Sequence, residues 1–441
     1  AQTSINHLQS VYGDNVDVII ADRRYGWING LVRETVTRSS TQERITISDK
    51  IDKVVTNRYL GIPIFLLMMW LVFKFTTDVA APYLDWVDGL ISGPITRWTV
   101  ALMAWAGLSG AWFESLLVDG VIAGVGGVLV FVPVLMCLYL ALAILEDSGY
   151  MARAAFVMDR LMHVLGLHGK SFLPMVVGFG CTVPAMLSCR LLEYRGQQRL
   201  TMLIVPFMSC SARLPVYAMI AGAFFPDRKW LVISSLYLLG ILAAILTALL
   251  FRPFLLRQEQ AFFALELPPY RKPAWQALWR SVWRRSWDFI THAGSVLLLA
   301  SLIVWLLSNF GPDLRPVAGQ QDSLLFTLGQ WLTPLFAPLG FGRWQLSVAL
   351  LSGFFSKEAV VSTLSVLYSA LTDLALPTLI SPAGAGAFLV FVLLYTPCLA
   401  TVATARRESG SWRFTLLLMA YQFAAAWVIS FFTFRLLTAI I

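Results

Sequence analysis

Hydrophobic stretches of about 20 residues, the length with which a helix crosses a bilayer, alternate with shorter polar or basic segments along most of this chain. Charged residues concentrate between the stretches and are scarce inside them. The pattern therefore predicts an all-α polytopic membrane protein built as a helical bundle. The expected crossings are residues 59–77, 120–145, 200–225, 230–251, 289–307, 383–405 and 414–437.

Two apolar regions are interrupted by helix-breaking residues. Gly178, Gly180 and Cys181 lie in the first, at 172–189, and several glycines and prolines divide the second, at 324–371. In lipid, backbone groups freed by a break need partners from protein or from a water-lined cavity, and transporters place substrate sites at such breaks. We predict broken, re-entrant helices here. Glycine-rich packing around a small cysteine is the alternative.

Segments outside the crossings differ in charge. Residues 1–56 are polar with one apolar helical face, which predicts a cytosolic helical stalk at the end of a larger soluble domain. Residues 252–288 form the most basic loop, and its tryptophans recur every four residues. That spacing predicts an interfacial helix on the inner leaflet. The mixed region 82–119 also contains several tryptophans, which predicts interfacial helices on the outer side.

The composition supports a membrane protein. The chain is 58% hydrophobic and 13% charged, whereas soluble domains are about half apolar and about a quarter charged. Its net charge of +8 is attributed to loop Lys and Arg facing the cytoplasm and anionic lipid, rather than to nucleic-acid binding. The same rule places the N-terminus in the cytoplasm. The sequence has no GxxxxGK[ST] phosphate loop, so we expect neither a nucleotide site nor an enzyme activity in this chain.

A weak internal repeat divides the apolar part. Residues 165–168 (LGLH) and 178–181 (GFGC) recur in outline as 339–342 (LGFG) and 353–356 (GFFS), and each copy precedes a span in which a cysteine follows a proline. The charge pattern gives the copies opposite orientations, which predicts inverted repeats with a site where their broken helices meet. Chance apolar resemblance is the alternative. The predicted divisions are 1–56, 57–119, 120–252, 253–288 and 289–441.

Polar groups inside apolar segments are the candidate site residues. Thiol and thioether groups favour soft and borderline transition metals over Mg²⁺ or Ca²⁺, and ionisable side chains at membrane depth are usually functional. The candidates are Cys181, Cys210, Cys398, Met208, Glu146, Asp147, Lys357 and Glu358.

Each candidate also has a structural interpretation. A cysteine in a membrane helix is usually a small hydrophobic residue, and we assign Cys137 and Cys189 to packing. Lys357 and Glu358 suit a salt bridge at a helix end, while Glu146 and Asp147 suit capping of the next helix. The membrane-region histidines are not at ligand spacing with one another, so we expect them at the interface. They are His163, His168 and His292.

Four segments carry a resemblance to a known family. They are 144–162 (ILEDSGYMARAAFVMDRLM), 166–185 (GLHGKSFLPMVVGFGCTVPA), 206–217 (PFMSCSARLPVY) and 395–415 (YTPCLATVATARRESGSWRFT). Together they resemble the bacterial ferrous-iron transporters of the FeoB family. The resemblance implies a multi-pass inner-membrane Fe²⁺ importer with two Gate-type repeats. It also implies an N-terminal GTPase domain, missing from this sequence, that would bind GTP and Mg²⁺.

The resemblance also assigns residues and partners. It places the metal path at Cys181 and Cys398, with Met208, Ser209 and Cys210 from the PFMSC segment. Small cytosolic Feo accessory proteins are implied partners, besides the lipid bilayer, and homo-oligomerisation stays open. This chain departs from the family pattern at two positions, with Thr182 where Asn is usual and Ser356 where Ala is common.

Two other functions fit a Gate-type membrane chain. A carrier for an organic solute such as a nucleoside would need a roomy pocket lined by aromatic and amide groups. A non-transporting membrane scaffold for a soluble GTPase would not depend on the cysteines.

Overall fold

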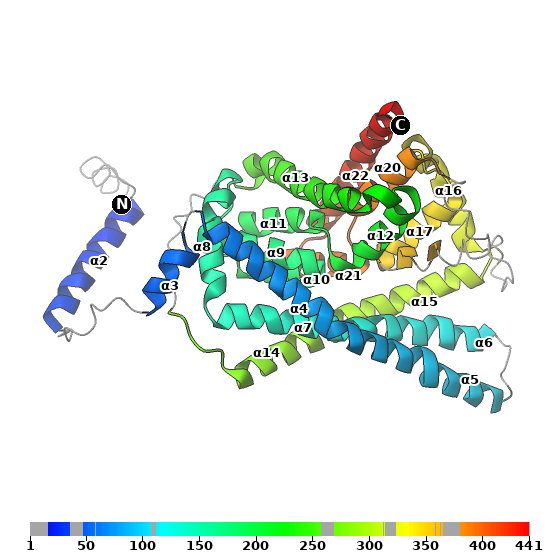
Figure 1. Ribbon diagram of the computed structural model, residues 1–441, viewed down its shortest axis with the longest axis horizontal. Coiled ribbons are helices and arrows are strands. Elements are labelled where there is room, and N and C mark those ends of the chain that lie inside the picture. The colour runs from blue at the N-terminus through cyan, green and yellow to red at the C-terminus, as the bar shows by residue number, and fades with distance from the viewer. Residues whose placement is uncertain are drawn as a thin grey trace. The chain divides into compact units, whose positions relative to one another are not determined.

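The computed structural model describes residues 16–35, 47–57, 59–105, 107, 112–256, 269–311, 313, 323–357, 359–361, 363–364 and 380–440. The regular elements in these ranges are helices (Figure 1). The chain divides into two units, Ala1–Lys53 and Val54–Ile441. The first contains α2 (Val16–Thr35), and α3 (Ile47–Val55) spans the boundary.

The second unit holds the helices that suit a membrane. Six helical stretches in the described residues are long and apolar enough to cross one, which confirms a polytopic all-α membrane protein. They are Gly61–Trp105, Phe113–Asp147, Arg195–Phe224, Pro226–Leu255, Pro382–Ser409 and Trp412–Ile440. One further pair, Leu324–Leu339 and Trp344–Phe355, qualifies together and is bent by 104° at its break. The crossing expected at 289–307 forms a helix but is not among the six.

The first long helix differs from the sequence-based prediction. α4 (Gly61–Leu90) continues through a π-helical turn (Ile91–Ile95) into α5 (Thr96–Trp105), so Pro82 and Pro94 do not end it. A π-turn inserts an extra residue per turn and accommodates such an interruption. Residues 82–105 thus belong to one continuous helical stretch, Gly61–Trp105, and their place at the outer interface stays a prediction.

Helix α7 (Ala123–Asp147) runs the length of the bundle and packs along α4 and α14 (Trp275–Asp288). The α4 residues buried there recur with helical spacing: Phe65, Met69, Val72, Thr76 and Ala80. α14 buries Leu278, Val282 and Ser286. Its tryptophans form the exposed face, as predicted, at Trp275, Trp279, Trp283 and Trp287.

The rest of the bundle contains short helices and two long ones, of 27 and 29 residues. Its first part contains α8 (Tyr150–Val164), η3 (Gly169–Ser171), α9 (Phe172–Gly180), α10 (Thr182–Ser188), α11 (Arg195–Ile204), η5 (Val205–Phe207), η6 (Ser211–Arg213), α12 (Leu214–Phe224) and α13 (Lys229–Leu255). Its second part contains α15 (Ser295–Asn309), α16 (Leu324–Phe336), α17 (Trp344–Phe355), α20 (Pro382–Leu394), α21 (Leu399–Ser409) and α22 (Trp412–Ile440).

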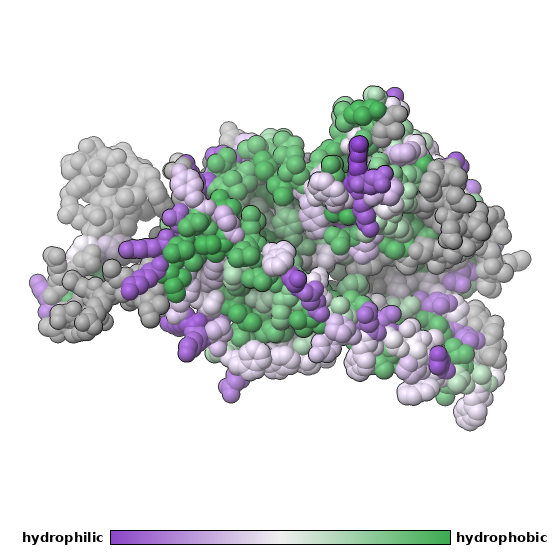
Figure 2. Space-filling model, in the orientation of Figure 1, coloured by the Kyte–Doolittle hydropathy of each residue, from purple (hydrophilic) through white to green (hydrophobic). Residues whose placement is uncertain are grey.

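Burial separates the central helices from those that suit lipid contact. α20 is apolar all round and buried over nearly its whole length, packed by α12, α13 and α22. By contrast, α4 and α13 expose rows of large apolar side chains, and Figure 2 shows a broad hydrophobic surface where α13 lies. The central breaks are thus enclosed by protein rather than by lipid.

Candidate metal path at the helix breaks

Four interruptions of helical backbone lie in the central part of the bundle. Cys181 is extended (φ −150°, ψ 132°) between α9 and α10, and Ser356 is extended (φ −143°, ψ 132°) after α17. A second interruption in each half covers 208–210, between η5 and η6, and 395–398, between α20 and α21. The predicted break at Cys181 is confirmed, and the free backbone groups of all four need protein partners.

The break at Cys181 and the break at 208–210 are in contact with each other. The Ser211 hydroxyl donates to the carbonyl of Gly180 at 2.9 Å. Gly178 lies so close to Met208 that an added Cβ would be 3.1 Å from the Met208 Cβ. A side chain at Gly178 would therefore separate α9 from the PFMSC segment.

A buried arginine holds the unwound PFMSC segment. Arg213 is 1% exposed, and its guanidinium donates to the carbonyls of Pro206 at 3.1 Å and Met208 at 3.3 Å. Ser209 donates to the Tyr217 hydroxyl at 3.0 Å within the same buried region. The charged donor replaces the helical hydrogen bonds that this segment lacks.

At the break that covers 395–398, a buried lysine binds a backbone carbonyl, as Arg213 does in the PFMSC segment. Lys357 is 4% exposed, donates to the Thr396 carbonyl at 2.8 Å and lies 3.1 Å from the centroid of the Tyr395 ring. Gly353 makes room for this ring, since an added Cβ would overlap the Tyr395 hydroxyl. Cation and ring together fix the carbonyl that precedes Pro397 and Cys398.

The structure brings Cys181 and Cys398 toward one region. Cys181 is the N-cap residue of α10 and Cys398 that of α21. These two helices pack against each other at the centre of the bundle (Figure 1). Both cysteines also pack against one apolar cluster, which contains Leu135 and Tyr139 of α7. Cys210 lies within electrostatic range of Cys398 and of Lys357.

Comparison with known proteins identifies the family. Family models described as "Ferrous iron transport protein B C terminus" and "FeoB cytosolic helical domain" match residues 233–285 and 1–37. The Gate model, described as "Nucleoside recognition", matches 128–224 and 290–412. The Fe(2+) transporter FeoB of Campylobacter jejuni is 35% identical over 92% of this chain and 67% of its own length. This chain belongs to the FeoB family.

Two other FeoB relatives match nearly the whole of this chain at similar identity. The Fe(2+) transporter FeoB of Staphylococcus aureus (strain COL) is 42% identical over 93% of this chain and 62% of its own length. The Fe(2+) transport protein A/Fe(2+) transporter FeoB fusion protein of Porphyromonas gingivalis is 40% identical over 96% of this chain and 55% of its own length. The chain therefore spans only about 55–62% of these two relatives. No solved structure matches it.

The acidic candidates of this FeoB chain make their contacts elsewhere. Glu146 forms an ion pair with Arg285 at 2.9 Å, and Asp147 accepts a hydrogen bond from the backbone of Ala274 at 2.9 Å. Both interactions attach α14 to the end of α7. The capping interpretation is wrong, since the N-cap of α8 is Gly149, with φ +85° and no side-chain cap. Glu358 lies outside the described residues.

Two cavities approach the cysteine region from opposite parts of α7. The larger cavity has a volume of about 800 Å³ and lies beside the first residues of α7. The polar side chains in its lining are carboxylates and hydroxyls: Asp88, Ser92, Thr96, Asp119, Ser301, Ser352, Ser356 and Thr363. The smaller, about 280 Å³, is lined near the end of α7 by side chains that include Tyr139, Glu146, Ser188 and Asp288. Leu135 lies between these stretches of α7, in the apolar cluster that Cys181 and Cys398 contact. This apolar cluster, called the cysteine layer below, includes Val128 from the lining of the larger cavity and Tyr139 from the lining of the smaller one.

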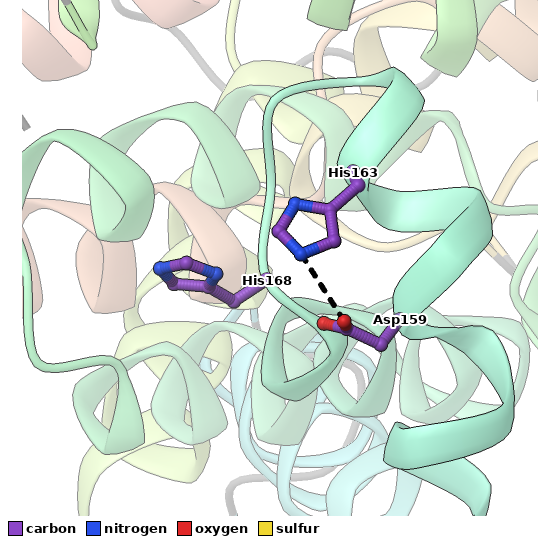
Figure 3. A group of neighbouring side chains, drawn as sticks. All are labelled: Asp159, His163 and His168. Atoms are coloured by element: carbon purple, nitrogen blue, oxygen red, sulfur yellow. Dashed lines mark ion pairs between the residues drawn. The ribbon is translucent and has the colours of Figure 1, made fainter. Parts of the chain in front are cut away.

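Some functional candidates were missed by sequence reasoning. Asp159, His163 and His168 lie together (Figure 3), so the expectation that these histidines are not at ligand spacing is wrong. Burial lowers the pKa of the His168 imidazole, and His163 lowers it further. The Asp-x₃-His spacing on one helix was the sequence signal for this group. The His292 side chain is outside the described residues.

Arg213 was also missed as a functional candidate. Its sequence signal was a charged side chain inside an apolar segment.

Proposed function

We propose that this chain forms the membrane path of a bacterial ferrous-iron importer, with Fe²⁺ as the transported substrate. One observation carries the proposal: Cys181 and Cys398 are the N-cap residues of two packed short helices, and both contact one apolar cluster on α7, between the stretches of α7 that line two cavities containing carboxylate and hydroxyl groups. The names of the relatives support the choice of cargo.

The donor set suits a borderline cation. α9 and α20 end at the breaks, so their last carbonyls carry partial negative charge beside the two thiols. Fe²⁺ accepts mixed sulfur and oxygen ligands, and a thiol contributes no buried charge until the metal displaces its proton. Met208 and Cys210 are further soft donors in this proposal, and transient binding must stay weak enough for release.

The proposed orientation follows the distribution of basic residues. Arg195, Arg252 and Arg285 lie at the end of the bundle that carries α8 and α14, which assigns this end to the cytoplasm. The larger cavity then opens toward the outside, where Asp88 and Asp119 attract a cation. The smaller cavity leads from the cysteine layer to the cytoplasm. The protein would be a multi-pass component of the inner membrane, its N-terminus cytoplasmic.

The two buried cations support an inverted-repeat arrangement. Arg213 and Lys357 each hold a carbonyl just before a cysteine of an unwound segment, one in each half of the chain. We propose that residues 120–252 and 289–441 are the two Gate-type repeats, that 253–288 is an interfacial helix between them, and that 1–56 and 57–119 precede them.

Energy coupling is assigned to parts of the whole protein outside this chain. We propose that GTP and Mg²⁺ act through a separate GTPase domain, because this sequence has no phosphate loop. An accessory protein of the Fe(2+) transport protein A type is a proposed partner, since the Porphyromonas gingivalis relative is named as a fusion with one.

An organic-solute carrier is the second candidate, favoured by the Gate description "Nucleoside recognition". The larger cavity has the size of a small-molecule site. Among the described residues that line it, however, none is Asn or Gln, and its polar groups are carboxylates and hydroxyls. Such oxygens suit a hydrated cation better than a nucleobase. Saturable uptake of a labelled nucleoside would support the alternative.

Fe²⁺ uptake into proteoliposomes tests the proposal. We expect uptake by the parent protein above empty liposomes, and a strong decrease in Cys181→Ser. Cys189→Ser is the matched control, because Cys189 is buried nearby and its thiol only donates to the Ala185 carbonyl, as a serine would. Equal uptake by parent protein and empty liposomes would contradict the proposal.

A further inference from the structure

One turn of α8 brings a carboxylate and an imidazole together. Asp159 and His163 are four residues apart, and the Asp159 Oδ2 lies 3.2 Å from the His163 Nε2. The Asp159 side chain is 18% exposed and that of His163 is 55% exposed. The pair is therefore accessible from solvent on one side and supported by protein on the other.

The end of α8 returns a second imidazole to this pair. Gly166 has φ +76°, its amide donates to the His163 carbonyl, and the Leu167 amide donates to the Met162 carbonyl, both at 2.9 Å. This is the Schellman arrangement, with Leu167 and Met162 buried in the same cluster. The chain reverses, and the His168 ring lies edge-on to the His163 ring at 5.8 Å between centroids.

Two close approaches fix the turn. The Gly169 amide donates to the Asp159 Oδ1 at 2.7 Å, and a Cβ on Gly169 would overlap the Ala155 carbonyl. On the other side, a Cβ on Gly166 would lie 2.6 Å from the Arg252 guanidinium. The hydrogen bond to Oδ1 orients the carboxylate so that Oδ2 faces His163, as partners of metal ligands do.

The three groups are arranged as a metal-binding set. One oxygen of Asp159 and one ring nitrogen from each of His163 and His168 all lie within 4.8 Å of one another (Figure 3). Nitrogen and carboxylate ligands bind transition metals at about 2.0–2.2 Å, so the three ligand atoms would draw closer together around a bound ion. Two histidines and one carboxylate form the facial set of non-haem Fe²⁺ sites, with further positions open to water.

We propose that Asp159, His163 and His168 bind a divalent transition metal at a site separate from the cysteine layer. The ligands exclude Mg²⁺ and Ca²⁺ as preferred ions, since two of the three are imidazoles. His168 precedes η3 and α9, and α9 ends at Gly180, just before Cys181. A metal here therefore links α8 to the segment that leads to the broken helix. Binding at this site does not depend on the transport function proposed above.

Co²⁺ titration of the purified protein, followed by visible absorption, tests the site. The titration is made in the Cys181→Ser/Cys398→Ser background, so that signal from the cysteine layer is absent and failure of the transport proposal stays distinguishable. We expect one bound equivalent, with affinity reduced more than about 100-fold in His163→Gln, since loss of a supporting partner alone costs about 10- to 100-fold. Asp159→Asn is expected to weaken binding while keeping the hydrogen bond to Gly169.

Glu193→Gln is the matched control. Glu193 is an exposed carboxylate on the same side of the bundle, paired with Lys170 at 2.6 Å, and its substitution should leave Co²⁺ affinity unchanged. His163 is more than half exposed, so its replacement leaves the fold intact. Unchanged Co²⁺ binding in His163→Gln and His168→Gln would overturn the proposal, as would equal weakening in Glu193→Gln.

Discussion

The Nζ of Lys357 donates a hydrogen bond of 2.8 Å to the carbonyl oxygen of Thr396, across two separate elements of the second half of the chain. The same ammonium lies against the Tyr395 ring. The acceptor lies just beyond the end of α20 and just before Cys398. The Lys357 side chain therefore has a structural task, because it satisfies a backbone carbonyl that the break leaves without a helical partner.

Lys357→Met tests that task. Methionine keeps the apolar length but leaves the Thr396 carbonyl without this donor, a loss of about 1–3 kcal/mol for a buried acceptor. We expect Fe²⁺ uptake to fall about ten-fold, equivalent to about 1.4 kcal/mol, and thermal stability in detergent to decrease. Lys229→Met, at an exposed lysine, is the control. Uptake at the parent rate in Lys357→Met would show that the break does not depend on the ammonium.

Gly353→Ala tests the close packing at the same break. The added methyl group would overlap the Tyr395 hydroxyl and the Val360 side chain. We expect a loss of about 1–3 kcal/mol in the free energy of unfolding, measured by thermal denaturation, and partial recovery when Tyr395→Phe is added. Gly89→Ala is the control, because nothing lies within 4 Å of the added Cβ. Equal stability of Gly353→Ala and Gly89→Ala would contradict the packing described here.

Single-cysteine labelling tests the orientation of the bundle. Arg271 and Trp105 are exposed, the first just before α14 and the second at the end of α5. With a membrane-impermeant thiol reagent we expect Arg271→Cys to react only from the cytoplasmic side and Trp105→Cys only from outside. Reversed labelling would overturn the assignment of the two cavities. The external segment predicted at 311–323 lies largely outside the described residues.

The break at Cys181 was predicted because its cause is local: glycines and a proline around Cys181 interrupt a helix whatever surrounds them. The breaks at 208–210 and 395–398 were missed, since both lie inside segments predicted as single crossings at 200–225 and 383–405. Hydrophobic length predicted the membrane class. The length of the first helix was not predicted, because the mixed composition and tryptophans of residues 82–105 do not indicate that α4 continues through Pro82, and through a π-turn at Pro94, into α5.

Contacts between distant segments were beyond the sequence. Nothing local indicates that Lys357 reaches Thr396, or that α10 packs on α21 and both N-cap cysteines contact one apolar cluster. The histidines were missed for a related reason, since the positive φ of Gly166 reverses the chain and returns His168 to His163. These arrangements depend on backbone reversal and tertiary packing, which residue periodicity does not encode.

The central claim is that Cys181 and Cys398 serve one metal path, and a double-mutant cycle of Fe²⁺ uptake tests it most directly. Cys181→Ser, Cys398→Ser and the double variant are compared with the parent in proteoliposomes, with protein amount and folding matched. We predict that each single variant loses uptake, and that the double variant loses less than the sum of the single losses in log rate, because residues that act as one unit are non-additive. Parent-level uptake in both single variants, or additive losses in the double variant, would contradict the claim.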